Sequence, residues 1–252
     1  MSNEKNHTPR RTVDERLSHI AFIMDGNGRW AKKRGLIREL GHRAGAETFR
    51  RVSTYCRDIG IKAVTVYVLS TENLTKRPER EVGALMDLLR RYLREALDDA
   101  HKNKIAFRFP GDRSALPDDI GAMMDRVEKE SECYSSMHIL NMCINYGGRA
   151  DIIGAVNRLI ANGEKCITEE MLTNALTTLP TPPDLIVRTG GDVRVSNFLL
   201  WDCAYSEFYF TDILWPDLDE KAIDDAIEDF YNRQRRYGSA PAEGAPAGSV
   251  NG

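Results

Sequence analysis

The sequence predicts an α/β fold, in which a mostly parallel β-sheet is covered by helices on both faces. Two observations support this prediction. Short apolar runs typical of strands alternate with longer segments in which apolar residues recur at helical spacing. No long stretch rich in proline, glycine or serine divides the chain between its ends, and no internal repeat is apparent. At 252 residues the chain can bury a sizeable core, so the sequence predicts a single domain.

Six apolar runs are the predicted strands of this sheet. Several are rich in β-branched or aromatic residues and end at polar or glycine-containing loops. Because parallel strands are buried on both faces, these runs need not alternate with polar residues. The predicted strands are Ile20–Met24, Ala63–Leu69, Ile105–Phe109, His138–Ile144, Leu185–Val187 and Glu207–Phe210.

The predicted helices lie between these strands. The 79–103 segment is the clearest of them, because its apolar side chains recur near the helical period. The full set lies near 43–58, 79–103, 118–132, 149–162, 168–178 and 219–236. The polar residues 1–16 are predicted to be flexible, and residues 17–238 to form the domain. The proline-rich residues 239–252 cannot bury enough surface to order themselves, so they are predicted to be a disordered tail.

Composition excludes several classes of protein. The apolar content of 42% and charged content of 29% are ordinary for a soluble globular protein, and the net charge of −3 gives no sign of a nucleic-acid partner. No run approaches the roughly 18 apolar residues that cross a bilayer. The five cysteines are scattered and lack a C-x-x-C spacing, which fits reduced thiols better than disulfides or a zinc site. We therefore expect a cytoplasmic protein.

Two segments, 19–30 and 185–201, carry the chemistry. Each places glycines and arginines directly after an apolar run, where a buried strand would open into a loop. Glycine lets the backbone approach a ligand, main-chain N–H groups point at phosphate oxygens, and arginine adds a forked charge. With Asp25 at the mouth of the first segment, this pattern indicates a metal-dependent enzyme that handles two phosphorylated substrates.

Asp25 has two interpretations from its residue type. As a carboxylate beside phosphate ligands it suits Mg²⁺, but aspartate is also a preferred helix N-cap. The segment Gly26–Ala31 matches a dinucleotide-binding turn, yet Asp25 would repel a pyrophosphate unless a cation lay between them. A calcium loop is also disfavoured, because Leu36 stands where a bidentate glutamate is required.

Other polar residues after the predicted strands are candidates for the same site. Arg29 and Arg38 could hold a diphosphate, and Arg188, Arg194 and Ser196 lie close together around Gly190-Gly191. His42, Ser70, Asn73 and Trp30 each have an ordinary structural interpretation as well, in the core or in a loop. Glu207, a charge in an apolar strand, needs a metal or an arginine as its partner.

Several motifs together resemble the cis-prenyltransferases, of which undecaprenyl diphosphate synthase is the familiar member. The motifs occur in the order found in that family, and the resemblance spans roughly residues 17–238. They are Ile-Met-Asp-Gly-Asn-Gly-Arg-Trp, Ser-Thr-Glu-Asn, Asn-Tyr-Gly-Gly-Arg, Arg-Thr-Gly-Gly, Arg-Val-Ser-Asn-Phe-Leu-Leu-Trp and Tyr-Phe-Thr-Asp-Ile-Leu-Trp-Pro-Asp.

The resemblance implies a homodimer of single α/β domains, each with a six-stranded, mostly parallel sheet and an apolar tunnel. It implies Mg²⁺-dependent condensation of isopentenyl diphosphate with an allylic diphosphate to form a Z double bond. By position, Gly26, Asn27, Gly28, Arg29 and Arg38 would hold the allylic diphosphate, next to Trp30, and Asp25 would bind Mg²⁺ with a contribution from Glu207. Arg188, Arg194 and Ser196 would hold isopentenyl diphosphate, with His42, Ser70, Asn73 and Arg77 as a supporting polar shell.

The chain departs from the family pattern at a few positions. Asp192 stands where many relatives have glutamate, Val193 where some have histidine, and Leu74 where tryptophan is common. One extra residue precedes Arg77, which makes its register uncertain. Val68 is larger than the alanine of long-chain members, which favours a short or medium product.

Alternative functions follow from the same sequence. The altered 73–77 loop is compatible with branched coupling of two allylic diphosphates. A non-catalytic partner subunit of the same fold is a second alternative, although the chain keeps Asp25, Arg29, Arg188 and Arg194. A nicotinamide-dependent oxidoreductase that uses Gly26–Ala31 is a third. Peripheral membrane contact is expected only if the product is long.

Overall fold

A computed structural model describes residues 12–76 and 78–233 of the chain. These residues contain a six-stranded sheet in the order β3-β4-β2-β1-β5-β6, in which every neighbouring pair is parallel. The sequence predicted a mostly parallel sheet, and the sheet is wholly parallel. The strands are β1 His19–Ile23, β2 Ala63–Ser70, β3 Ala106–Arg108, β4 Ile139–Tyr146, β5 Leu185–Arg188 and β6 Glu207–Phe210.

Both faces of the sheet are buried in hydrophobic cores. Alternate residues of β1 point to opposite faces, so that Ile20 and Phe22 join the larger core while Ala21 and Ile23 join the smaller one. All five residues of β1 are buried. This two-sided burial explains why the predicted strands are apolar throughout.

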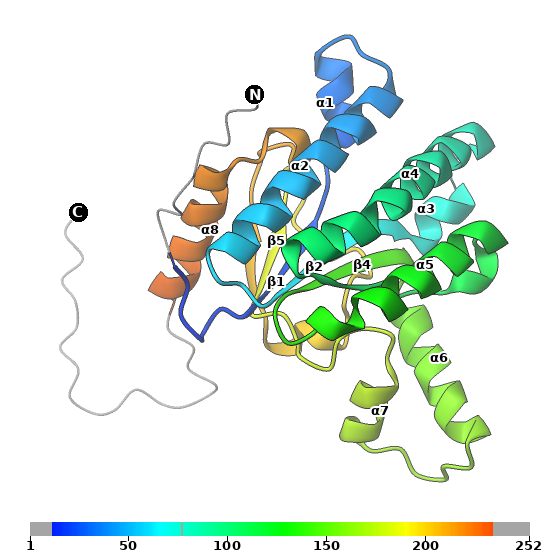
Figure 1. Cartoon of the computed structure of the whole chain (residues 1–252). Helices are drawn as coiled ribbons and strands as arrows, with labels where there is room; N and C mark the ends of the chain where they lie inside the picture. The colour runs from blue at the N-terminus through cyan, green and yellow to red at the C-terminus, as the bar shows by residue number, and fades with distance from the viewer. Residues whose placement is uncertain (1–11, 77, 234–252) are drawn as a thin grey trace, which may run out of the picture.

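Four helices cover the face of the larger core. Figure 1 shows α8, α2, α4 and α5 side by side in front of the sheet, and buried residues of all four belong to that core. Their bounds are α2 Arg38–Asp58, α4 Glu79–Asn103, α5 Asp118–Ser131 and α8 Glu220–Asn232. The opposite face carries the smaller core, to which Phe198 and Leu199 contribute, and α6 (Gly148–Ala161) and α7 (Glu169–Ala175) pack against each other in a third cluster.

Short helices complete the structure. Two of them, α1 (Asn27–Lys33) and α3 (Thr71–Lys76), directly follow β1 and β2 along the chain and were not predicted from the sequence. Glycines and short polar residues at their starts weaken the helical pattern, so both segments looked like loops. The 3₁₀ turns are η1 Arg113–Ala115, η2 Glu132–Tyr134, η3 Asp202–Tyr205 and η4 Trp215–Asp217.

The predicted bounds agree best where the apolar pattern is strongest. The bounds of α4 and β6 match their predictions, whereas α2 begins at Arg38 instead of residue 43 and α7 ends at Ala175 instead of residue 178. Residues 12–16, predicted to be flexible, include two backbone contacts to the domain. The N–H of Val13 donates to the Ile59 carbonyl and that of Asp14 to the Tyr231 hydroxyl. Residues 1–11 and the predicted tail, 239–252, lie outside the described residues.

The strand order fixes where a ligand site can form. The chain moves from β1 to β2 on one side and later returns to add β5 on the other side of β1. In open α/β sheets, ligands bind in the crevice at the carboxyl ends of the strands where the strand order reverses. The β1–β5 boundary is such a point, and both sequence motifs begin there. Among the described residues, no helix has the length and apolar character needed to cross a membrane.

The buried carboxylate of Asp202, the first residue of η3, leads to a testable prediction about stability. Burial raises the pKa of Asp202 to about 6, and its carboxylate accepts a hydrogen bond from the Thr178 hydroxyl at 3.1 Å. The unfolded pKa is about 3.9, so the folded state binds this proton more tightly, and the free energy of unfolding falls as pH rises from about 4 to about 6. Asp202→Asn should therefore stabilise the fold by on the order of 2 kcal/mol at pH 8 and by much less at pH 4.

Urea unfolding at the two pH values measures this difference. Asp98→Asn, on the exposed side of α4, is the control and should show little change at either pH. Equal stabilisation by Asp202→Asn at both pH values would contradict the burial argument.

Candidate active site

The two sequence motifs meet through an ion pair between neighbouring strands. Asp25 lies two residues beyond the end of β1, and Arg188 is the last residue of β5. The Arg188 Nη2 atom lies 3.0 Å from Asp25 Oδ2. This contact joins residues 163 positions apart in the chain. The sequence prediction that the two motifs converge is consistent with this contact.

Arg188 organises the second motif from a buried position. Its residue is only 3% exposed, and its Nη1 atom donates to the Ser196 hydroxyl at 2.8 Å and to the Arg194 carbonyl. Its Nη2 atom also lies 3.4 Å from Asp192 Oδ2. Within residues 12–76 and 78–233, its buried Nε atom has no hydrogen-bond acceptor. A buried donor without a protein partner is expected where a ligand supplies the acceptor.

The second oxygen of Asp25 faces Arg29. Arg29 Nη2 lies 3.0 Å from Asp25 Oδ1, and Arg29 also donates to the Gly190 carbonyl. The sequence left open whether Asp25 caps a helix. The structure rejects that alternative, because Gly26 is the N-cap of α1 and the Asp25 carboxylate binds two arginines.

Asp192 adds a second carboxylate to this cluster. Its Oδ2 atom lies 2.6 Å from Arg194 Nη2, and this guanidinium holds the pKa of Asp192 below its usual range. The Asp192 carboxylate also lies 4.0 Å from Arg29. Sequence reasoning noted Asp192 only as a departure from the family pattern and gave it no role at the site.

The backbone of Asp25 is held as firmly as its side chain. The Asp25 carbonyl accepts hydrogen bonds from the Thr189 hydroxyl at 2.7 Å and from the Trp215 N–H at 3.0 Å. Gly190 lies against this backbone with a φ of +89°, and a Cβ there would lie 2.5 Å from Arg29 Nη2. Glycine at position 190 therefore permits both a left-handed backbone and the close approach of Arg29.

Left-handed backbone conformations cluster in the loop that holds Ser196. Ser196, Asn197 and Leu199 have φ values of 50°, 64° and 45°. Such conformations are costly outside glycine and persist where surrounding contacts determine them. Asn197 supplies two of these contacts, donating to Glu72 Oε1 at 2.9 Å and accepting from the Arg149 N–H at 3.0 Å.

The first turns of α2 and α4 carry another polar group of the site. Glu81 of α4 lies 3.2 Å from Arg38 Nη1, and its other oxygen lies 3.7 Å from His42 Nε2. Arg38 also approaches Gly28, where a Cβ would lie 3.2 Å from its Nε atom. Sequence reasoning missed Glu81, because a carboxylate in a first helical turn is expected for the helix dipole alone.

The other residues that the sequence predicted for the site make contacts in different parts of the fold. Ser70, at the end of β2, accepts a hydrogen bond from the Asn73 N–H at 3.0 Å, the local loop contact that the sequence allowed as an alternative. Trp30 donates its indole N–H to Asp217 at 2.7 Å and lies under the Arg34 guanidinium, so these contacts place it in a network with η4. Arg77 lies outside the described residues.

Glu207 lies away from Asp25 within one chain. It begins β6 and pairs in register with Leu185, whereas Arg188 pairs with Phe210 at the other end of the two strands. Three residues of strand separate those levels by about 10 Å. The Glu207 carboxylate lies 2.9 Å from Arg233. Within one chain the structure therefore does not bring Glu207 to Asp25, and Arg233 is the arginine partner that the sequence allowed for it.

The residues at this site fit a magnesium ion. Asp25 and Asp192 both approach Arg188 Nη2, which places two carboxylates at one edge of the sheet. Mg²⁺ is usually held by one or two carboxylates together with substrate phosphates and water. No group of three or more possible metal-binding side chains occurs in the part of the chain that the structure describes.

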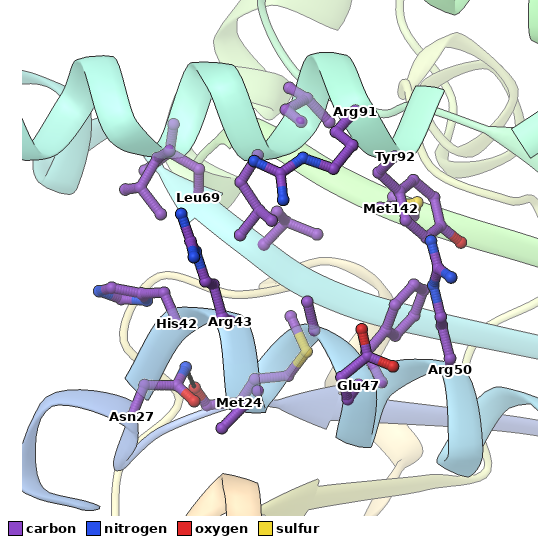
Figure 2. A pocket seen from close by; sticks show the side chains of 18 of the residues that line it. Met24, Asn27, His42, Arg43, Glu47, Arg50, Leu69, Arg91, Tyr92 and Met142 are labelled. Atoms are coloured by element: carbon purple, nitrogen blue, oxygen red, sulfur yellow. Dashed lines mark hydrogen bonds between the residues drawn. The ribbon is translucent and has the colours of Figure 1, made fainter. Parts of the chain in front are cut away.

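An apolar cavity extends from the first motif. Its volume is about 390 Å³, and it lies between α2 and α4 above strands β2 and β4. Met24, Asn27 and His42 line this cavity, and Figure 2 shows Asn27 and His42 at one side of it. The site thus joins a cation-rich sheet edge to an apolar chamber, the arrangement expected for an amphipathic substrate with an anionic head.

Comparisons with known proteins agree on one family. Residues 23–238 match the family model described as "Putative undecaprenyl diphosphate synthase". An isoprenyl transferase from Fusobacterium nucleatum is 49% identical over 220 residues, covering 87% of this chain and 95% of the relative. An isoprenyl transferase from Chromobacterium violaceum is 47% identical over 221 residues, covering 87% of each chain.

Two solved structures are similar over most of the chain. Lavandulyl diphosphate synthase from Lavandula x intermedia, in complex with dimethylallyl diphosphate, has a TM-score of 0.83 and 32% identity. It covers 89% of this chain and 100% of its own. A probable undecaprenyl diphosphate synthase from Campylobacter jejuni has a TM-score of 0.75 and 34% identity, covering 90% and 100%.

The contact between Gly190 and Arg29 yields a prediction with a matched control. Gly190→Ala combines the strain of a left-handed backbone with displacement of Arg29, whereas Gly163→Ala has the same strain at a φ of +94° and open space around its Cβ. Each variant should lose about 1–2 kcal/mol of stability from backbone strain. Gly190→Ala alone should also weaken inorganic pyrophosphate binding, by about tenfold or more.

Urea unfolding and calorimetric titration with pyrophosphate separate the two effects. Equal pyrophosphate affinity in the two variants would show that Gly190 is needed only for the turn.

Proposed function

The chain belongs to the undecaprenyl diphosphate synthase family of prenyltransferases, and we propose that it condenses an allylic diphosphate with isopentenyl diphosphate to form a Z-configured product. The observation that carries this proposal is the junction between the arginine-rich edge at Asp25 and the apolar cavity. A prenyl diphosphate has the same two parts, an anionic head and an apolar tail.

The first motif is the proposed site of the allylic diphosphate. Gly26, Asn27 and Gly28 bring main-chain N–H groups to the start of α1, and Arg29 and Arg38 supply cations there. Arg38 is paired with Glu81 at 3.2 Å in the present structure, so a diphosphate would compete with Glu81 for this guanidinium. The tail would enter the cavity past Asn27 and His42.

The second motif is the proposed site of isopentenyl diphosphate. Arg194 is exposed and carries a forked charge that suits a diphosphate, while the Ser196 hydroxyl is oriented by Arg188. The Arg188 guanidinium, buried and shared between the two motifs, would fix the distance between the two substrates. Holding the two substrates in a fixed geometry lowers the activation barrier of the condensation, because their translational and rotational freedom is already lost on binding.

In the proposed reaction the C–O bond of the allylic diphosphate breaks, a C–C bond forms to isopentenyl diphosphate, and a proton is lost from the latter. Bound Mg²⁺, held by Asp25 with Asp192 nearby, would neutralise charge on the departing diphosphate. Arg29 and Arg38 add fixed positive charge at the same place. His42, Ser70 and Asn73 are the proposed polar shell around the reacting groups.

The product is proposed to be of short or medium length. Val68 lines the cavity together with Leu69 of the same strand, so its branched side chain takes up space that alanine would leave open. We also propose that the protein is a cytoplasmic homodimer. Ile153 and Tyr205, exposed by 61% and 76%, are apolar surfaces that such an interface would cover. Sedimentation equilibrium would contradict this if only monomer were found at micromolar concentration.

Branched coupling of two allylic diphosphates is a second candidate. The likeness to lavandulyl diphosphate synthase, with a TM-score of 0.83, is the observation that favours it. Incubation with dimethylallyl diphosphate alone separates the two reactions. A ten-carbon product without isopentenyl diphosphate would establish branched coupling, and its absence would leave the regular condensation.

The main test is a product assay on the wild type and on Asp25→Asn. Labelled isopentenyl diphosphate is supplied with geranyl or farnesyl diphosphate and Mg²⁺, and the products are resolved by chain length and double-bond geometry. Asp25→Asn removes the carboxylate that pairs with Arg29 and Arg188, so turnover should fall about 10²–10³-fold. EDTA should abolish wild-type activity, and added Mg²⁺ should restore it.

Asp87→Asn is the matched control. Its carboxylate is 72% exposed on α4 and pairs with Arg90, so its turnover should be close to that of the wild type. No product from the wild type with any allylic primer would contradict the proposal and favour a non-catalytic partner subunit.

A further inference from the structure

Asn197 ties the loop of the second motif to two other parts of the sheet edge. Its side-chain N–H group donates to Glu72 Oε1 at 2.9 Å, and its Oδ1 atom accepts from the Arg149 N–H at 3.0 Å. Its main-chain carbonyl accepts from the Gly148 N–H at 2.7 Å. The loop is thereby fastened to α3, which follows β2, and to α6, which follows β4.

The shape of this loop depends on these contacts. Ser196 and Asn197 have φ values of 50° and 64°, a left-handed conformation that is costly for residues other than glycine. Asparagine adopts it more readily than most side chains do. Gly147 lies against the Asn197 amide, and a Cβ there would lie 2.7 Å from Nδ2. Glycine at position 147 therefore leaves room for the amide that reaches Glu72.

Glu72 offers Asn197 a fixed acceptor. It is half-buried in α3, and its Oε2 atom accepts a hydrogen bond from the Thr71 hydroxyl at 3.1 Å. Burial alone would raise the pKa of the Glu72 carboxyl, but hydrogen bonds from its own N–H and from Asn197 outweigh burial and hold the pKa below its usual range. The ionised carboxylate can only accept, which matches the Asn197 donor.

Glu72 also lies between two residues of the proposed polar shell. Ser70 and Asn73 stand on either side of it in the chain, and the Asn73 N–H donates to the Ser70 hydroxyl at 3.0 Å. The helix α3, Thr71–Lys76, has only six residues, so a shift of Glu72 would move this whole segment. The hydrogen bond to Asn197 thus connects the second motif to the polar shell.

We propose that Glu72 and Asn197 are positioning residues, which hold the isopentenyl diphosphate site at a fixed distance from the polar shell. This inference rests on the proposed function, because it treats Ser196 as a ligand of that substrate. Glu72 and Asn197 act through Ser196, whose hydroxyl accepts from Arg188 at 2.8 Å and is carried by the loop that Asn197 fixes.

Loss of the hydrogen bond should affect the two substrates differently. Without it the left-handed loop can relax and the Ser196 hydroxyl leaves its position, so isopentenyl diphosphate should bind less tightly. The proposed allylic site uses Arg29 and Arg38 instead, which pair with Asp25 and Glu81. The KM for isopentenyl diphosphate should therefore rise while that for the allylic diphosphate stays the same.

Asn197→Asp tests the contact with little change to the backbone. Aspartate also tolerates a left-handed φ and can still accept from the Arg149 N–H, but it places a carboxylate opposite Glu72. The KM for isopentenyl diphosphate should rise about tenfold or more, and that for farnesyl diphosphate should stay within about twofold. Steady-state assays with Mg²⁺ that vary each substrate in turn measure both constants.

The reversed pair, Asn197→Asp with Glu72→Gln, restores a hydrogen bond with donor and acceptor exchanged. Its KM for isopentenyl diphosphate should return to within about threefold of the wild-type value. Glu72→Gln alone should also stay close to the wild type, because its amide oxygen can still accept from Asn197. No recovery in the reversed pair would overturn the proposal.

Glu72→Leu separates the hydrogen bond from charge. It keeps similar bulk but removes both the acceptor and a negative charge. If charge near the diphosphate were the only effect, isopentenyl diphosphate would bind more tightly, whereas loss of the acceptor should raise its KM about tenfold. A KM equal to or below that of the wild type would contradict the proposal. This variant also replaces Asn197→Asp if thermal unfolding shows that the latter does not fold.

Asn145→Asp is the matched control. Asn145 is also a left-handed asparagine, with a φ of 47°, and its side chain donates to the Asp112 carbonyl at 2.8 Å. This variant should lower the melting temperature and keep both KM values. An equal rise in its KM for isopentenyl diphosphate would overturn the proposal, because any loosening of the sheet edge would then have the same effect.

The outcomes for the wild type separate this inference from the proposed function. A wild type that forms no prenyl product would sink both. A wild type that forms product, with an unchanged KM for isopentenyl diphosphate in Asn197→Asp and Glu72→Leu, would sink this inference alone.

Discussion

The ion pair between Arg188 and Asp25 is the interaction on which the rest of the site depends. A guanidinium that is 3% exposed needs partners, because an unpaired buried charge is very costly. Those partners come from both sequence motifs: the Asp25 carboxylate, the Ser196 hydroxyl and the Asp192 carboxylate. Satisfying one buried cation therefore assembles both proposed phosphate sites, in the crevice that the strand order opens between β1 and β5.

A second constraint is the separation of polar and apolar parts. The arginines lie at the carboxyl edge of the sheet, and the cavity runs away from that edge between α2 and α4. Glu81 of α4 pairs with Arg38 at the start of α2. Further along the same two helices, Glu95 of α4 pairs with Arg50 of α2. An amphipathic ligand would thus lie with its head among fixed charges and its tail in the apolar chamber.

The sequence predicted the parts whose signal is local. Buried parallel strands are apolar throughout, and the helical repeat of 79–103 is strong, so the sheet and α4 were predicted well. Asp25 and Arg188 were found because both follow predicted strands, Ile20–Met24 and Leu185–Val187, and the carboxyl ends of parallel strands share one sheet edge. The distance of Glu207 from Asp25 within one chain could not be predicted, because it depends on strand register, which puts Glu207 level with Leu185 at the opposite edge. Glu81 acts through Arg38 and His42, which are distant in sequence, and the contacts of Asp192 with its neighbours Arg188 and Arg194 depend on a loop conformation that no local pattern encodes.

The carbonyl of Asp25 has a consequence for how the chain folds. It accepts hydrogen bonds from Thr189, 164 positions away, and from Trp215, so segments from the two ends of the domain meet at one residue. Contacts of such long sequence separation are slow to form, since the intervening chain must be ordered first. During synthesis β1 leaves the ribosome long before its neighbour β5 exists. The edge of β1 that faces β5 must therefore wait unpaired, and chaperone binding during translation would be most useful over that interval.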